Sequence, residues 1–110
     1  MHLLTKLEEL ILLSVWKLGD RAYGKTIYQM LCRVTEKKLS LGGIYFPLER
    51  LMKKGYIKAI AGGSTKKRRG HPKKYYKITE EGIAMLADMR KVYERMWSDL
   101  PAMHGYPVEE

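Results

Sequence analysis

Apolar residues recur every three or four positions along two segments near the start of the chain, and this spacing predicts two amphipathic helices. The first covers residues 6–18, with Thr5 and Glu8 at the capping-box spacing and Gly19 as its stop. The second begins near Gly24. Its predicted buried face comprises Ile27, Met30, Leu31 and Val34.

The stretch "LSLGGIYFPLERLMKKG" predicts a third helix, with Ser40 as a candidate cap and Gly55 as its stop. Pro47 has no backbone donor, so we expect this helix to begin no earlier than Gly42 or to bend in its first turns. The residues predicted to face inward are Ile44, Leu48, Leu51 and Met52.

Two runs rich in aromatic and β-branched residues, 56–61 and 73–79, predict a β-hairpin, and Thr79 is a candidate cap for a last helix. Three helices, a hairpin and a helix in this order are typical of a winged helix-turn-helix. We therefore expect a mainly α fold with a two-stranded β wing (α+β). The winged helix-turn-helix domain would span residues 1–79, followed by a C-terminal dimerisation helix over 80–101 and an irregular tail over 102–110.

The positive charge of the chain is concentrated in the expected wing. The 110 residues carry a formal net charge of +9, and residues 62–79 contain seven Lys or Arg and no Asp or Glu. Charge clustered in this way indicates a polyanionic partner, most often nucleic acid. No apolar run approaches the length of a membrane span, and the single Cys32 excludes an internal disulfide framework. We therefore expect a cytoplasmic protein with no membrane partner.

Three motifs resemble the PadR-like family of winged helix-turn-helix transcriptional regulators. They are "AYG" at the start of the second helix, "GIY" at the start of the third and "YYKIT" at the end of the hairpin. The resemblance extends roughly over residues 5–100. It implies a homodimeric DNA-binding regulator, usually a repressor, with its last helix in the dimer interface.

Contacts with double-stranded DNA are expected from the start of the third helix and from the wing. Gly42 and Gly43 permit close approach of the backbone, and Ser40 and Tyr45 can donate hydrogen bonds to phosphates. Tyr45 has the alternative of packing under the wing. Phe46 either touches a thymine methyl group or belongs to the core. The phosphate candidates of the wing are Lys66, Lys67, Arg68, Arg69, Lys73 and Lys74, with Lys25 and Lys54 as weaker candidates elsewhere.

The last helix carries apolar residues at the spacing of a coiled-coil seam. The seam comprises Leu86, Met89, Tyr93, Met96 and Leu100. Such a stripe either packs on the chain's own core or forms a two-fold dimer, and we expect a homodimer in which each first helix packs on the partner's last helix. Trp16, Tyr93 and Trp97 form a candidate pocket for a small planar aromatic effector, unless these side chains simply fill the interface.

The sequence contains no motif that is typical of an enzyme. It contains no metal-ligand spacing, no phosphate-binding glycine loop and no nucleophile elbow, so we expect no catalytic residue, metal or cofactor. The function that we expect is a sequence-specific, double-stranded DNA-binding transcriptional repressor. Two alternatives stay open: a small basic RNA-binding protein, and a winged-helix module whose basic loop binds an acidic protein.

Overall fold

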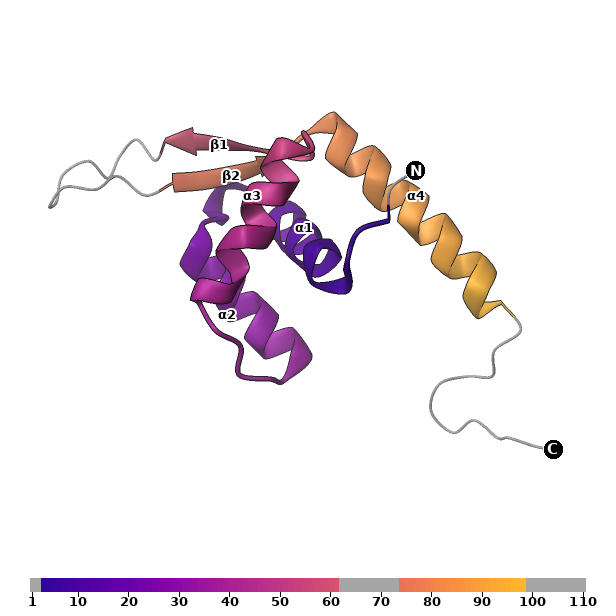
Figure 1. The fold of residues 1–110 in the computed structure, drawn as a ribbon, viewed down its shortest axis with the longest axis horizontal. Coiled ribbons are helices and arrows are strands. Elements are labelled where there is room, and N and C mark those ends of the chain that lie inside the picture. Colours follow the sequence, from indigo (N-terminus) through magenta and orange to yellow (C-terminus); the bar gives the residue numbers. More distant parts are fainter. Residues whose placement is uncertain (1–2, 62–73, 99–110) are drawn as a thin grey trace, which may run out of the picture.

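The computed structural model describes residues 3–61 and 74–98, which form a helical body with one β-hairpin (Figure 1). The elements are α1 (Lys6–Leu18), the 3₁₀ turn η1 (Gly19–Arg21), α2 (Gly24–Thr35), the 3₁₀ turn η2 (Gly42–Ile44), α3 (Tyr45–Lys53), β1 (Ile57–Ala61), β2 (Lys74–Ile78) and α4 (Glu80–Trp97). This order confirms the predicted winged helix-turn-helix, a mainly α fold with a two-stranded wing.

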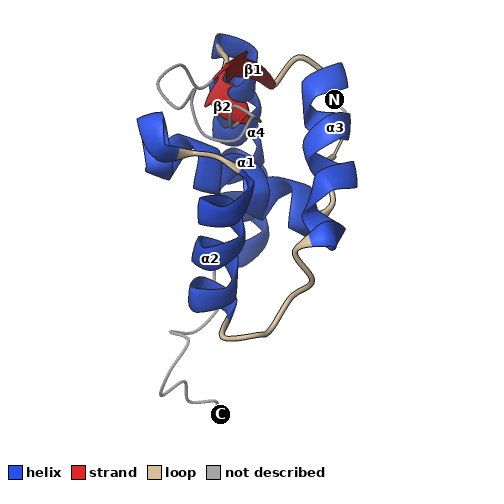
Figure 2. Cartoon of the chain, turned by 90° about the vertical axis from the view of Figure 1, so that its left-hand side faces the viewer, coloured by secondary structure: helices blue, strands red, loops and turns tan. Residues whose placement is uncertain are grey.

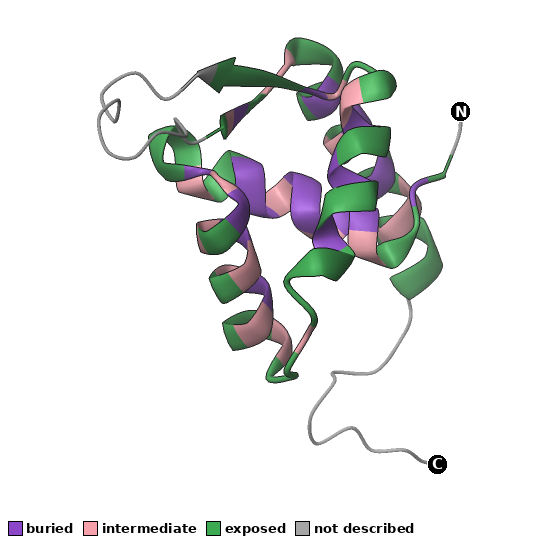
Figure 3. Cartoon of the chain, turned by 60° about the vertical axis from the view of Figure 1, so that its left-hand side comes forward, coloured by how far each residue is buried: buried purple, intermediate pink, exposed green. Residues whose placement is uncertain are grey.

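Helix α1 lies at the centre of the body because most of its circumference is apolar. The predicted capping box begins it: the Thr5 hydroxyl accepts a hydrogen bond from the Glu8 N–H, and the Glu8 carboxylate accepts one from the Thr5 N–H. Ile11, Leu12 and Val15 are at most 1% exposed. The helix packs against α2, α3, α4 and β2, and buried residues gather along it in Figure 3.

Helices α2 and α3 form the helix-turn-helix pair, and the segment that joins them is seen below both helices in Figure 2. Glu36 ends α2 in the left-handed region, at φ 60°. The Tyr28 hydroxyl then donates a hydrogen bond of 2.8 Å to the carbonyl oxygen of Leu39, which ties the joining segment to α2. The predicted inward position of Val34 is wrong: this side chain is 62% exposed, because it lies in the last turn of α2, beyond the buried Leu31.

Pro47 sets where α3 begins. The helix starts at Tyr45, so Pro47 is its third residue, where a backbone N–H would have no partner within the helix. The chain enters through the 3₁₀ turn η2, and this start lies within the predicted limit. Leu48 and Leu51 are fully buried, as predicted.

Ser40 does not cap α3. The N-cap residue of α3 is Ile44, and it makes no side-chain hydrogen bond. The Ser40 hydroxyl instead accepts the N–H of Gly43 at 3.3 Å, before the helix begins. Ser40 therefore shapes the 3₁₀ turn that leads into α3.

The hairpin pairs β1 and β2 antiparallel, with Ile57 opposite Ile78. Tyr76 is 5% exposed, and its N–H donates a hydrogen bond of 2.8 Å to the carbonyl oxygen of Ala22. This bond attaches the hairpin to the segment just before α2. The residues that connect the strands lie outside the described residues, and they include Lys66, Lys67, Arg68, Arg69 and Lys73.

Thr79 positions the start of α4. Its hydroxyl accepts the N–H of Gly82 at 3.0 Å and donates to the carbonyl oxygen of Gly55 at 2.6 Å. A Cβ at Gly82 would lie only 2.2 Å from the carbonyl oxygen of Tyr56, so the helix touches the chain before β1 directly. The "TEEG" sequence thereby fixes the angle at which α4 leaves the hairpin.

Helix α4 contacts the body as far as Tyr93 and projects from it beyond that residue. Met85 and Met89 are 5% and 4% exposed in the core, and the Tyr93 hydroxyl bonds to Glu9 of α1, whereas the end of the helix extends away from the body (Figure 1). Met89 is thus part of the chain's own core, so at this position the stripe follows the alternative of packing on that core rather than on a partner. The helix ends at Trp97, and residues 99–110, including Leu100, lie outside the described residues.

Candidate nucleic-acid interface

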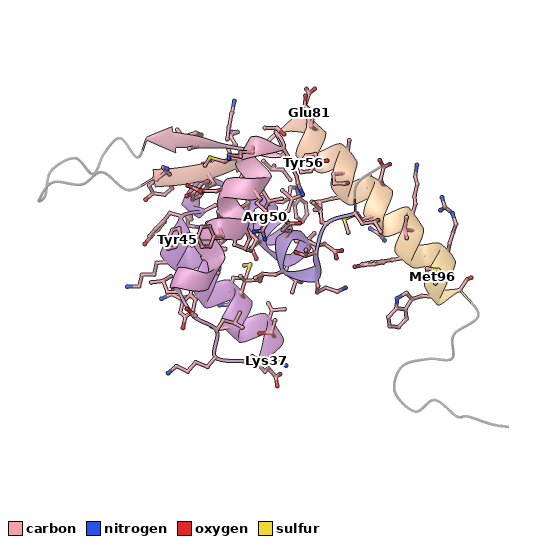
Figure 4. The ribbon with its side chains drawn as sticks, in the orientation of Figure 1. Lys37, Tyr45, Arg50, Tyr56, Glu81 and Met96 are labelled. Atoms are coloured by element: carbon pink, nitrogen blue, oxygen red, sulfur yellow. The ribbon has the colours of Figure 1, made fainter. Side chains whose placement is uncertain are left out.

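Tyr45 leaves the first turn of α3 and lies against the start of α2 (Figure 4). Gly24 makes room for it: a Cβ at Gly24 would lie 2.3 Å from the Tyr45 hydroxyl oxygen. Because Tyr45 is still 45% exposed, part of the ring packs on α2 and part faces solvent. The "AYG" motif therefore accommodates the aromatic residue of the "GIY" motif.

A groove of about 460 Å³ lies where the start of α2, the face of α3 and strand β2 meet, and we call it the α3 groove. It is lined by Tyr23, Gly24, Lys25, Tyr45, Glu49, Lys74 and Tyr76. The fold thus brings together three predicted contact residues, Lys25, Tyr45 and Lys74, from three separate elements.

Tyr76 forms the closed side of this groove. Burial raises the pKa of its phenol, and the neighbouring Tyr45 and Glu49 raise it further. The phenol therefore stays neutral at physiological pH, and the charged groups that line the groove are Lys25, Glu49 and Lys74.

The approach to α3 is open to solvent. Ser40, Gly42 and Gly43 are exposed, and Phe46 is 73% exposed. The alternative that placed Phe46 in the core is therefore wrong. Its ring stands on the outer side of α3, where a large partner can reach it.

The hairpin adds positive charge on both of its faces. Lys74 lies on the same face as the buried Tyr76, toward α3, because side chains alternate along a strand. Lys58 and Lys77 stand directly opposite each other across the strands. Like charges in this arrangement destabilise a strand pair, so a bound polyanion would relieve the repulsion.

Glu8 fixes α3 to α1. Its carboxylate accepts a hydrogen bond of 2.6 Å from the Nε of Arg50 and lies 3.7 Å from the Nζ of Lys54. Burial acts to raise the pKa of Glu8, but the hydrogen bonds from Arg50 and Thr5 and the two nearby cations outweigh it, so the pKa is lowered below its usual 4.5. Lys54, a weak candidate for DNA contact, thus has a structural partner.

A second groove, of about 600 Å³, lies between α1 and α4 on another part of the surface, and we call it the α1–α4 groove. It is lined by Lys6, Glu9, Leu10, Leu13, Trp16, Ile83, Leu86, Ala87, Arg90 and Tyr93. Trp16 and Tyr93, two of the predicted effector residues, therefore line one cavity. Trp97 is not among its lining residues and is 50% exposed.

A polar cluster closes one part of the α1–α4 groove. Lys6 donates a hydrogen bond of 2.7 Å to the Tyr93 hydroxyl, which in turn donates to the buried carboxylate of Glu9. Apolar side chains remain uncovered on the same two helices. Trp16 is 55% exposed, Ile83 50% and Met96 76%.

Sequence reasoning missed the roles of three acidic residues, which lie in different parts of the structure. Glu8 was assigned only to the capping box, because its bond to Arg50 spans 42 positions and no local pattern reveals it. Glu9 was missed for the same reason, since Tyr93 is 84 positions away. Glu49 was overlooked although a signal existed: it lies four positions after Tyr45, on the same side of the helix.

Within residues 3–61 and 74–98, no group of His, Cys, Asp and Glu side chains could hold a metal ion. No helix in this part of the chain has the length and apolar character needed to cross a bilayer.

A helix-turn-helix followed by a two-stranded wing defines the class of winged-helix proteins. The chain belongs to the PadR-like family of transcriptional regulators, since the sequence model of the "Transcriptional regulator PadR-like family" matches residues 12–88. The family predicted from the "AYG", "GIY" and "YYKIT" motifs is thereby confirmed. A comparison with curated protein sequences finds no match.

Solved structures of the same family are similar over most of their length. A PadR-like transcription factor from Bacteroides fragilis is 28% identical, with 82% of each chain covered and a TM-score of 0.69. A PadR-like transcriptional regulator from Bacillus cereus is 26% identical, with 82% of each chain covered and a TM-score of 0.67. A PadR family regulator from Clostridium difficile is 29% identical, covering 84% of this chain and 90% of the other, with a TM-score of 0.64. Members of this family are transcriptional regulators, a class whose proteins are generally not enzymes.

Proposed function

We propose that this protein is a sequence-specific regulator of transcription that binds double-stranded DNA as a homodimer and acts as a repressor. The observation that carries the proposal is the α3 groove, in which Lys25, Tyr45 and Lys74 converge from α2, α3 and β2. In the cytoplasm, the bound dimer would block access to the promoter that it covers.

Helix α3 would act as the recognition helix and enter the major groove of the DNA. Gly42 and Gly43 lie just before its first turn, and they have no side chain to hold the backbone away from the duplex. The exposed ring of Phe46 would touch a thymine methyl group, and the hydroxyls of Ser40 and Tyr45 would donate to phosphates.

Basic residues on both sides of α3 would contact the phosphate backbone of the DNA. Lys25 lies in the first turn of α2, where backbone N–H groups also favour an anion. Lys74 and the connecting segment of the hairpin, with Lys66, Lys67, Arg68, Arg69 and Lys73, would follow the backbone to the next groove. These contacts supply affinity and orientation rather than base preference.

The homodimer is supported by the apolar side chains that the chain leaves uncovered on α1 and α4. We infer that the uncovered face of α4, with its projecting end, packs on α1 of the partner and covers Trp16, Leu86 and Met96. Tyr93 and Leu100 would lie at the edges of this contact. Two recognition helices held at a fixed distance would then meet two half-sites of the DNA.

The α1–α4 groove also supports an effector site for a planar aromatic compound, with Trp16 and Tyr93 in its wall and Trp97 approaching from the partner. Its size, about 600 Å³, suits a small molecule. If the site exists, such a compound quenches tryptophan fluorescence and weakens DNA binding over the same concentration range. If the groove is filled by the partner helix, neither signal changes.

A competition measurement tests the proposed function against its alternatives. Fluorescence anisotropy would follow a labelled duplex selected from genomic fragments, with unlabelled random duplex and single-stranded RNA as competitors. For a regulator of the proposed kind, unlabelled copies of the selected duplex displace the labelled one at far lower concentration than random duplex or RNA does. Equal displacement by RNA would favour an RNA-binding protein, and no binding to any nucleic acid would favour a protein-interaction module.

A further inference from the structure

Glu49 is an acidic residue on a surface that otherwise suits phosphates. It lines the α3 groove together with Lys25 and Lys74, four positions after Tyr45 on the same helix. The side chain is exposed, so it faces whatever occupies the groove. Its charge adds to burial and to Tyr45 in raising the pKa of the Tyr76 phenol, which lines the same groove.

No structural task explains this carboxylate within residues 3–61 and 74–98. It is not buried, and it does not cap α3, whose N-cap makes no side-chain hydrogen bond. Lys53 stands at the i+4 position, the favourable spacing for a helical ion pair, yet the described ion pairs do not include Glu49. On a DNA-binding face its charge repels the phosphates and therefore weakens binding to duplexes in general.

The major groove offers one base edge that suits a carboxylate best. Cytosine presents an N4 amino donor there, whereas guanine presents only acceptors and thymine an acceptor and a methyl group. Adenine has an amino donor too, but its N7 acceptor lies beside the donor and repels a second carboxylate oxygen.

We propose that Glu49 is a specificity-determining residue that selects a cytosine in each half-site by accepting a hydrogen bond from the N4 amino group. This role rests on the proposed function, since it requires α3 to lie in the major groove. Lys25, Tyr45 and Lys74 hold the backbone around it, so the carboxylate is presented to a base edge. The carboxylate lowers the affinity for duplexes in general and increases the preference for one base.

Selection from a random duplex pool, followed by affinity measurements on single-base variants, tests the assignment. The wild type is expected to enrich a C·G pair at one position of each half-site and to lose about tenfold in affinity when that cytosine is replaced. Glu49→Ala should lose the preference at that position alone. The same variant should bind random duplex about twofold more tightly or better, because a charge that repels phosphate is gone.

Glu49→Gln adds a test that a merely solvated residue would not pass. A glutamine amide matches the N6 and N7 groups of adenine, so the enriched base should change from cytosine toward adenine. The matched control is Glu81→Gln, which changes another exposed acid, at the start of α4 and far from Tyr45 in Figure 4. This control should keep both the base preference and the affinity for random duplex.

The outcomes separate this assignment from the proposed function. A Glu49→Ala protein that binds DNA and keeps every base preference of the wild type overturns the role of Glu49 and leaves DNA binding intact. A wild type that binds no duplex overturns the proposed function and this role with it. Thermal melting of each variant checks the fold, and an exposed residue such as Glu49 should leave the melting temperature unchanged.

Discussion

At the scale of single residues, Glu8 is a buried acidic side chain that joins two helices. It is 2% exposed and connects the start of α1 to Arg50 of α3 and to Lys54, which follows that helix. A buried carboxylate is costly without partners, and here the two cations and the Thr5 N–H provide them. The position of α3 in the body therefore depends on this charge.

Acid titration of Glu8→Gln tests that dependence. The pKa of Glu8 is lowered in the folded chain, so its contribution is complete above the unfolded value of about 4.5 and is lost as the pH falls through the lower folded value. At pH 7 the variant should lose about 1–2 kcal/mol of unfolding free energy. In urea unfolding, the difference from wild type should shrink below about pH 4. A difference that is the same at pH 7 and pH 3 would mean that the ionised pair contributes nothing.

At the scale of elements, local patterns identified the helices and both strands. Caps and stops depend on neighbouring residues, so Thr5 and Thr79 marked the starts of α1 and α4 correctly, and Pro47 set the limit for the start of α3. Ser40 did not mark that start, because its hydroxyl bonds within the 3₁₀ turn before the helix. Periodicity could not say how far a neighbouring element reaches. Val34 continues the apolar stripe of α2 yet lies past the body, and Met89 continues the seam of α4 yet lies inside the core.

Helix α3 has two sides that should respond differently to truncation. Phe46→Ala removes an exposed ring and should lower affinity for the specific duplex by about five- to tenfold, with no change in melting temperature. Leu48→Ala opens a cavity in the core and should lower the unfolding free energy by about 2–5 kcal/mol. Anisotropy and thermal melting separate the two effects. Equal loss of stability in both variants would contradict the assignment of the outer face.

At the scale of the whole molecule, the chain presents two surfaces on either side of α1. One is the α3 groove with the hairpin, and the other is the α1–α4 groove with its uncovered apolar side chains. From charge, motif and spacing the sequence singled out Lys25, Tyr45 and Lys74 of the first surface, and Trp16, Leu86 and Tyr93 of the second. It could not reveal the pairs Glu8–Arg50 and Glu9–Tyr93, because they depend on how distant segments pack.

The dimer is tested by placing a charge on the projecting end of α4. Met96→Asp buries an unpaired carboxylate in the proposed interface, so sedimentation should detect monomers at micromolar concentration. DNA affinity should fall with it, because the half-sites would no longer be bound together. The matched control is Val34→Asp, which charges another exposed apolar position, on α2, and should remain dimeric. A monomeric wild type would contradict the proposed assembly.

The binding of DNA across the α3 groove is tested most directly by the salt dependence of duplex binding. This dependence would be compared between the wild type and the double variant Lys25→Ala/Lys74→Ala. Both lysines line the α3 groove, so the double variant should bind every duplex more weakly. Its plot of log K against log salt should flatten by about 0.9 for each phosphate contact removed. Lys91→Ala, which removes an exposed lysine from α4, should keep the wild-type slope. A double variant with the affinity and slope of the wild type would show that DNA, if bound at all, does not lie across the α3 groove.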